Sequence, residues 1–278
     1  MIFLVLLLVL LIDKLTDWRR LAQDDGPWLR LLQGVERGGE RTPNAWWSVS
    51  MLVLLPVLLL GLLLTALQPL AYGWLSLPLH LLVVLFSLGR GHGKRELGPF
   101  RDAWRRGDDE AAALVAERDL GLVAVDAPAL LRAVEARLLW RGYEGFFAVI
   151  FWYVLLGPAA ALAYRLLSLT VGHARHEAIR ERAAQLRHAF DWLAVRVLLV
   201  SFGLVGNFVA ANRVLLGHLL HWEIPAPQLL AEVGSVAADL QQPHVGEAGI
   251  TRLDSLAALL VRTRMLWYAA IAFWTLLL

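Results

Sequence analysis

Long stretches without a charged side chain are the main feature of this sequence. Between Arg41 and Arg90, 48 successive residues include no Asp, Glu, Lys or Arg. One helical crossing of a bilayer takes about 20 mainly apolar residues, so this stretch is long enough for two crossings. We therefore expect two membrane spans, near residues 46–66 and 70–88, with a break at Pro69 between them.

Three more apolar stretches predict further helices at membrane depth. Residues 145–164 are uncharged but contain Gly157 and Pro158, so this helix is expected either to kink while crossing or to turn back as a re-entrant pair. Residues 197–212 are interpreted as a short span or as a helix buried against other spans. The last candidate, residues 265–278, is too short to cross unless its helix begins earlier, near Leu256.

The N-terminal residues form another apolar stretch. A secretory signal would begin with basic residues and end at a cleavage site of small residues, and neither is present. We expect residues 1–17 to form a retained, partly buried helix that ends on Asp13, Lys14 and Asp17.

The composition agrees with a membrane protein. Apolar residues make up 58% of the 278 residues and charged residues 18%, and the mean hydropathy is +0.58. Soluble domains carry about 25% charged residues, so these values argue against a soluble globule. The absence of cysteine excludes disulfides, thiolate metal sites and a cysteine nucleophile. The net charge of +2 gives no reason to expect a nucleic-acid partner, whereas the lipid bilayer is an expected partner.

The segments between the apolar stretches repeat their apolar residues at helical spacing. Asp126 followed by Pro128 is a typical helix start, and the apolar positions after it continue in steps of three and four. The same spacing recurs at Ile179, Ala183, Leu186, Phe190 and Leu193, at Leu229, Leu230, Val233 and Leu240, and at Ile250, Leu253, Leu256, Leu260 and Val261. Residues 213–250, with three prolines, are predicted to be the least ordered part.

These patterns predict an all-α fold. We expect a polytopic membrane protein with four to five transmembrane or re-entrant helices plus cytoplasmic amphipathic helices. Residues 1–278 are expected to form a single membrane domain, with helical extramembrane segments near 89–141, 165–192 and 213–255.

The arginine distribution orients the chain. Segments 13–41 and 89–141 hold six and ten basic residues, whereas the connection 67–74 between the first two spans holds none. By the positive-inside rule both basic segments face the cytoplasm. The segment 165–192, with five arginines, lies outside if residues 145–164 cross once and inside if they turn back, and the sequence leaves both possibilities open.

A glycine-rich basic turn follows the second predicted span. Arg90, His92 and Lys94 stand among glycines there, but the Walker pattern would need glycine at position 88 and Ser or Thr at 95. A cationic loop that attracts anionic lipid headgroups or an anionic ligand is as plausible as one that only sets topology. We take these three residues as ligand-binding candidates.

Two other sets of polar residues suggest sites. The pairs His173/His176 and His218/His221 have a spacing that would suit zinc, but interfacial histidines near helix ends are far commoner, and we predict no metal site. A second set flanks or interrupts the apolar stretches, where unpaired polar groups are costly, so each member is a candidate by default. This set comprises Asp13, Glu144, Arg165, Asn207 and Asn212.

Several motifs resemble the AmpE family of inner-membrane proteins. They are the leucine-rich N-terminal helix ending at Asp13, the run Gly26-Pro-Trp-Leu-Arg-Leu-Leu32, the run Arg141-Gly-Tyr-Glu-Gly-Phe-Phe147, and the run Leu156-Gly-Pro-Ala-Ala-Ala-Leu-Ala-Tyr-Arg165. The resemblance covers essentially the full length. It implies a link to regulation of chromosomal β-lactamase and to peptidoglycan recycling, hence to antibiotic resistance, with Arg30 and Asp13 near Glu144 and Arg165 in the scaffold.

A weaker resemblance extends to the CbiB/CobD membrane enzymes of cobalamin biosynthesis. Those enzymes form an amide between a corrinoid acid and an aminopropanol. Where they carry an acidic-Asn-Thr run before Asp-Gly, this sequence has Trp140, Arg141 and Gly142 before Glu144-Gly145. The acid that they carry after the Tyr-Arg pair is also absent, so the resemblance preserves the membrane scaffold better than the ligase chemistry.

Three functions follow as hypotheses. The first is an inner-membrane regulator or sensor that binds an anionic small molecule, a cell-wall-derived ligand or a protein partner at its cytoplasmic face. The second is a membrane enzyme with amide-forming or nucleotide-dependent chemistry. The third is a transporter of amphiphilic anions, which the arginines around the spans favour and the lack of inverted repeats argues against. The sequence contains no complete catalytic motif and identifies no cofactor.

Overall fold

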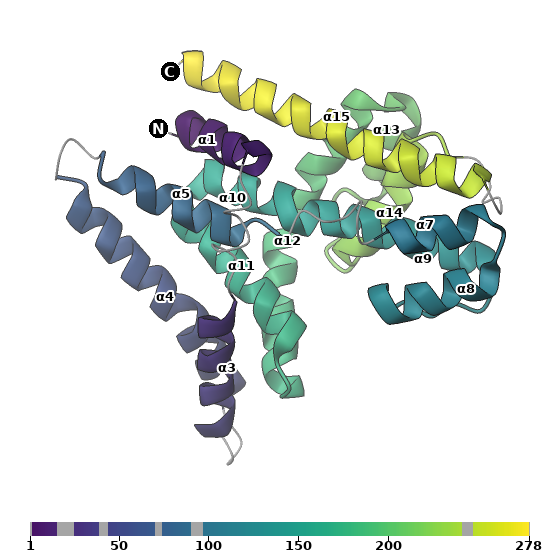
Figure 1. Cartoon of the computed structure of the whole chain (residues 1–278). Helices are drawn as coiled ribbons and strands as arrows, with labels where there is room; N and C mark the ends of the chain where they lie inside the picture. The colour runs from purple at the N-terminus through teal and green to yellow at the C-terminus, as the bar shows by residue number, and fades with distance from the viewer. Residues whose placement is uncertain are drawn as a thin grey trace. The chain divides into compact units, whose positions relative to one another are not determined.

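The computed structural model describes residues 2–15, 25–38, 44–69, 74–89, 97–240 and 247–277 (Figure 1). Within these ranges every regular element is helical and none is a strand. The chain groups into two compact units. Unit 1 comprises residues 1–90, 144–194 and 274–278, and unit 2 comprises residues 91–143 and 195–273. The prediction of a single domain stays a prediction.

Unit 1 is a bundle of apolar helices built around one central helix. Its elements are α1 (Ile2–Leu15), α3 (Gly26–Gly38), α4 (Ala45–Leu67), α5 (Ser76–Ser87), most of the π-helical turn η3 (Tyr143–Phe147), α10 (Ala148–Leu156), α11 (Pro158–His173) and the first part of α12 (Glu177–Val205). The central helix is α11, which packs against α4, α5 and α10. The core joins Leu166 and Leu167 of α11 to Leu52 of α4, with Trp28 of α3 and Ile179 of α12 closing it.

The chain turns back at Gly157, between α10 and α11. Gly157 has φ +83° and ψ −170°, a left-handed region that residues with a Cβ rarely adopt. Pro158 then opens α11, where its fixed φ suits the first helical turn. Because α10 and α11 pack against each other, the apolar stretch 145–164 is divided between two packed helices and is not one straight helix. The kinked crossing and the re-entrant pair both stay predictions for this stretch.

Unit 2 is a second helical cluster with its own core. Its elements are α7 (Gly98–Arg105), α8 (Asp109–Val115), the π-helical turn η2 (Ala116–Leu120), α9 (Ala127–Gly142), the end of α12, α13 (Phe208–His218), α14 (Ala226–Ala237) and most of α15 (Glu247–Leu277). Phe100 and Trp104 of α7 stack on each other inside this core, against Leu131 and Val134 of α9 and Leu253 of α15.

Buried arginines stabilise unit 2 through specific partners. Arg252 of α15 donates from Nε and Nη2 to the two carboxylate oxygens of Glu135 in α9, at 2.7 and 3.0 Å. Arg196 of α12 donates to the backbone carbonyl of His218, the last residue of α13, and to that of His221 just after this helix. A cation suits this end of a helix, because its last carbonyls lack partners and carry partial negative charge.

The all-α membrane fold predicted from the sequence is confirmed. Three helices among the described residues are long and apolar enough to cross a membrane: Ala45–Leu67, Glu177–Val205 and Gly249–Thr275. The first predicted span corresponds to α4, and the second to the shorter apolar helix α5. The last predicted helix begins at Glu247, earlier than expected, which gives it the length to cross.

One predicted span is wrong as a single helix. The chain breaks between α12 and α13 at Gly206 and Asn207, so the apolar stretch 197–212 belongs to two helices. Asn207 caps α13 by accepting from the backbone N–H of Ala210, and its own N–H donates to the carbonyl of Ala237. A Cβ at Gly206 would lie 2.3 Å from that same carbonyl oxygen, so the turn requires a glycine.

The amphipathic patterns outside the spans are mostly confirmed. Asp126 accepts from the backbone N–H of Ala129 and caps α9, with Pro128 in its first turn. The apolar stripes that begin at Leu130, Leu229 and Ile250 are largely buried. The expectation that residues 213–250 form the least ordered part is wrong for the portion that folds as α14.

Two glycines bring distant segments of unit 1 together. The N–H of Gly89, just after α5, donates to the carbonyl of Gly145 in η3 at 2.8 Å. A Cβ placed on Gly89 would lie 2.6 Å from the Cα of Gly145, closer than real contacts allow. This backbone crossing fixes the position of the neighbouring Glu144.

We predict that Gly89→Ala destabilises the protein by roughly 1–3 kcal/mol, because the added methyl group meets backbone and not a side chain that can turn away. Thermal unfolding of the purified protein in a neutral detergent measures the effect. Gly61→Ala is the matched control, since a Cβ on Gly61 in α4 meets nothing within 4 Å. Equal stability of the two variants would contradict the importance of the crossing.

Candidate functional site

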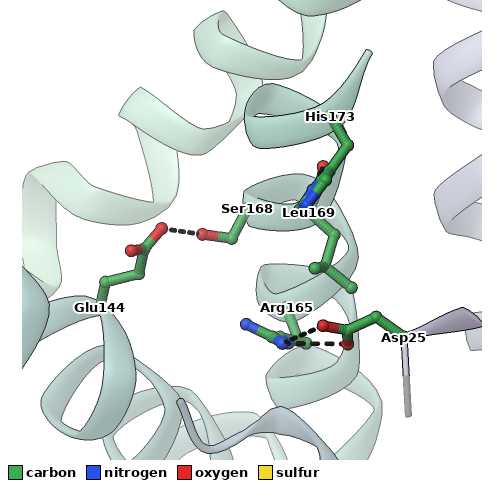
Figure 2. Close-up of polar contacts among 6 residues, drawn as sticks. All are labelled: Asp25, Glu144, Arg165, Ser168, Leu169 and His173. Atoms are coloured by element: carbon green, nitrogen blue, oxygen red, sulfur yellow. Dashed lines mark hydrogen bonds and ion pairs between the residues drawn. The ribbon is translucent and has the colours of Figure 1, made fainter. Parts of the chain in front are cut away.

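Glu144 lies at a break in helical geometry, in the π-helical turn η3 that joins α9 to α10. Such turns widen the helix by one residue and are frequent at functional sites. The Glu144 carboxylate points toward α11, where its Oε1 accepts a hydrogen bond from the hydroxyl of Ser168 (Figure 2). Its side chain is 22% exposed, so the carboxylate is half-buried and still accessible.

Arg187 of α12 lies between two carboxylates. Its Nη1 is 3.6 Å from Oε1 of Glu144, and its Nε is 3.8 Å from Oδ2 of Asp191. Asp191 follows Arg187 by one turn of α12 and is 4% exposed. One guanidinium therefore serves two acids, and neither ion pair has the close, two-bond geometry of an optimal arginine–carboxylate pair.

A buried tyrosine completes the group. Tyr164 of α11 is fully buried and lies within electrostatic range of Glu144, Arg187 and Asp191. We call Glu144, Tyr164, Ser168, Arg187 and Asp191 the α11–α12 polar cluster. It holds two carboxylates, one guanidinium and two hydroxyls inside unit 1, so its formal charge is negative with both acids ionised.

Arg165 makes a separate ion pair with Asp25. Its Nη2 is 3.0 and 3.2 Å from the two carboxylate oxygens of Asp25, the residue just before α3. Both side chains are mostly buried, at 14% and 13% exposed, and the guanidinium lies 6.0 Å from the ring centre of Phe86. Figure 2 shows this pair and the Glu144–Ser168 hydrogen bond on different sides of α11.

The structure describes only some of the predicted site residues. Glu144 and Arg165 both lie in unit 1, but each has its own partners and neither bonds the other. Arg30 is exposed on α3 and its Nε donates to the carbonyl of Gly26 in its own helix, so it joins neither group. Asp13 belongs to α1, but its side chain lies outside the described residues, as do Arg90, His92 and Lys94 altogether.

The sequence did not identify the residues that pair with Arg165 and Glu144 or complete their groups: Asp25, Ser168, Arg187 and Asp191. A signal existed for two of them, because Arg187 and Asp191 stand four residues apart at the start of an apolar stretch, and opposite charges at this spacing share a helix face. No local signal identified Asp25 or Ser168, whose partners lie 140 and 24 residues away.

The groups of the α11–α12 polar cluster suit a charged organic ligand better than a metal ion. Within the described ranges, no three His, Asp or Glu side chains gather where they could hold a metal ion. Of the histidines considered for zinc, His218 has its Nε2 3.6 Å from Oε1 of Glu232. In the α11–α12 polar cluster, a ligand with an anionic group could compete with Glu144 for Arg187, and one with a cationic group could compete with Arg187 for the acids.

Comparisons with known proteins agree with both resemblances found in the sequence. The family model described as "Regulatory signalling modulator protein AmpE" matches residues 1–275. The protein named "Cobalamin biosynthesis protein CobD" from Stutzerimonas stutzeri (strain A1501) is 26% identical over 255 residues, covering 86% of this chain and 82% of that protein. "Protein AmpE" from Shigella flexneri is 25% identical over 196 residues, covering 66% and 69%. No solved structure matches.

We predict that Arg187→Met lowers the stability of the protein by about 1–3 kcal/mol, because two half-buried or buried carboxylates then lack their shared counter-charge. Unfolding of the purified protein in detergent gives the value. The control Arg180→Met removes an exposed pair with Glu177 and should cost less than about 1 kcal/mol.

The double variant Arg187→Met with Glu144→Gln tests the coupling itself. Removing one carboxylate together with the guanidinium should recover part of the loss, since less uncompensated charge stays buried. Additive losses in the double variant would mean that Arg187 and Glu144 do not interact.

Proposed function

The chain belongs to the AmpE family, and from that premise we propose that it is a multi-pass protein of the bacterial inner membrane that regulates β-lactamase induction. It would do so by responding to the state of peptidoglycan recycling. The observation that carries the proposal is the family match across residues 1–275, whose description is that of a regulatory signalling modulator. The three long apolar helices support membrane insertion with more than one crossing.

The α11–α12 polar cluster is the sensing site in this proposal. Arg187 lies 3.6 Å from the Glu144 carboxylate and 3.8 Å from that of Asp191, and the Glu144 side chain is 22% exposed. The ion pairs of Arg187 are therefore loose enough to be exchanged for contacts with a ligand. A cell-wall-derived or other anionic small molecule would take the guanidinium from Glu144. A protein partner could be bound through the same groups if it presents a carboxylate.

Ligand binding at this cluster would be transmitted by α11 and α12. A ligand shifts an equilibrium only through a difference in its affinity for two states. In one state Arg187 pairs with Glu144 and Asp191, and in the other it pairs with the ligand while Glu144 keeps its hydrogen bond from Ser168. Because the groups lie on two helices and a π-helical turn, the exchange changes how these elements pack.

We predict that deleting the gene changes inducible β-lactamase activity and the pools of cytoplasmic muropeptides, and that the wild-type gene restores both. Glu144→Gln and Arg187→Met should fail to restore them while the proteins still reach the membrane. The control Arg106→Gln, which changes an exposed side chain in unit 2, should complement fully. Unchanged enzyme activity and muropeptide pools in the deletion strain would refute the proposed function.

A second function is favoured by a specific observation. The match to the CobD protein covers 86% of this chain, a larger share than the 66% covered by the AmpE relative. Under this alternative the protein would be a membrane enzyme with amide-forming or nucleotide-dependent chemistry, and Glu144 would contact the substrate.

This alternative predicts that the purified protein hydrolyses ATP in the presence of a corrinoid acid and an aminopropanol, or retains a corrinoid through purification. Glu144→Gln should abolish the turnover, whereas Arg106→Gln should leave it unchanged. A protein that folds in detergent but shows neither turnover nor bound corrinoid would exclude the enzyme.

A further inference from the structure

Two segments far apart in the chain meet at one end of unit 1. Glu36, buried near the end of α3, accepts hydrogen bonds from the backbone N–H groups of Arg175 at 2.7 Å and His176 at 3.2 Å, just before α12 begins. Further along α12, the guanidinium of Arg182 lies 5.3 Å from the ring centre of Trp46, at the start of α4. The end of α3, the start of α4 and the start of α12 therefore lie together (Figure 1).

Tryptophans fix the depth of this end relative to a bilayer. Helix α4 is strongly apolar and only a small part of it is buried inside the protein, so most of its surface suits lipid. Its first turn carries Trp46 and Trp47, which are 47% and 72% exposed. Exposed tryptophans at the end of a span prefer the headgroup level, so this end of unit 1 belongs at the membrane surface.

The contacts of Glu36 and Asp25 also indicate on which side of the membrane residues 165–182 lie. The basic segment 13–41, which includes α3, is expected to face the cytoplasm by the positive-inside rule. Glu36 of α3 binds the backbone at 175–176, and Asp25 binds Arg165. These contacts lead us to expect residues 165–182 on the same side of the membrane as α3.

Positive charge dominates the exposed surface at this end. We define the interfacial rim as Arg37, Trp46, Trp47, Arg175, Arg180 and Arg182. Three of its arginines are exposed and Arg182 is half-buried. Two exposed acids on α12, Glu177 and Glu181, lie beside these four arginines, and Glu177 pairs with Arg180, so the rim keeps a net positive charge. The rim thus offers guanidinium groups beside indole rings, next to a lipid-facing helix.

We propose that this interfacial rim binds the phosphate groups of anionic phospholipids in the cytoplasmic leaflet. Guanidinium groups bind phosphate oxygens through paired, charge-assisted hydrogen bonds, and basic surfaces next to a span attract anionic lipid. A lipid fits better than a soluble anion because Trp46, Trp47 and the apolar surface of α4 continue from the rim and contact the acyl chains. The lipid would hold α3 and α12 in place at the membrane surface.

The test uses the purified full chain in a neutral detergent. Phosphatidylglycerol or phosphatidylcholine is titrated in, and bound lipid is counted by native mass spectrometry. We expect the wild-type protein to retain phosphatidylglycerol in preference to phosphatidylcholine. The double variant Arg180→Gln with Arg182→Gln should lower the affinity for phosphatidylglycerol by about fivefold for each guanidinium removed and leave phosphatidylcholine binding unchanged.

Two further variants keep the test decisive. Arg37→Gln with Arg175→Gln removes two exposed rim charges without touching the Arg182–Trp46 contact, so it reports on lipid binding even if the first pair folds poorly. Arg105→Gln with Arg106→Gln is the matched control, because it removes the same charge from exposed positions of unit 2. The control should bind phosphatidylglycerol like the wild type.

Several outcomes would overturn the proposal. Equal binding of the two lipids by the wild type would show no headgroup preference, and an equal loss in the control would make the effect one of net charge. Unchanged binding in both rim variants would assign the rim to another partner, such as an acidic protein surface. Displacement of the lipid by an equal concentration of inorganic phosphate would identify a site for free anions.

Discussion

Unit 1 depends on pairing the polar side chains that α11 carries into an apolar bundle. Arg165 and Ser168 stand one turn apart on a helix that packs against α4, α5 and α10. A buried charge or hydroxyl without a partner is costly, and the cost rises where no water can reach it. Asp25 and Glu144 meet this requirement from different sides of the helix, so the start of α3 and the turn η3 are held to α11 by the polar groups that it buries.

These pairs connect parts of unit 1 that have different proposed roles. The half of α11 that bears Ser168 also forms the α11–α12 polar cluster with Arg187 and Asp191. Its C-terminal end leads into the interfacial rim, where Glu36 holds the residues before α12. Helix α3 is joined to α11 near its start and to the residues before α12 near its end. A change in how α11 and α12 pack would therefore alter the position of α3 at the membrane surface. The sensing site and the lipid surface proposed above would then be coupled through rigid helices.

The sequence predicted the helices where the determining forces are local. Spans follow from length and apolarity, because a bilayer forces each crossing segment to satisfy its own backbone hydrogen bonds. The start of α9 follows from Asp126 and Pro128, which act within one turn. The prediction failed at Gly206, where the apolar stretch continues but the helix ends. The turn there is set by a backbone contact with Ala237, which the hydropathy of the sequence does not reveal.

For the candidate site, the sequence by itself determined which residues were costly to bury, since a charge beside an apolar stretch needs a partner wherever the chain folds. It therefore pointed to Glu144 and Arg165 without showing what they bind. Only the tertiary structure decided that Arg165 pairs with Asp25, that Glu144 faces Ser168 and Arg187, and that the two residues serve separate groups. The physical reason is that helix periodicity relates residues within a few turns, whereas these partners meet through packing between helices that are far apart in the chain.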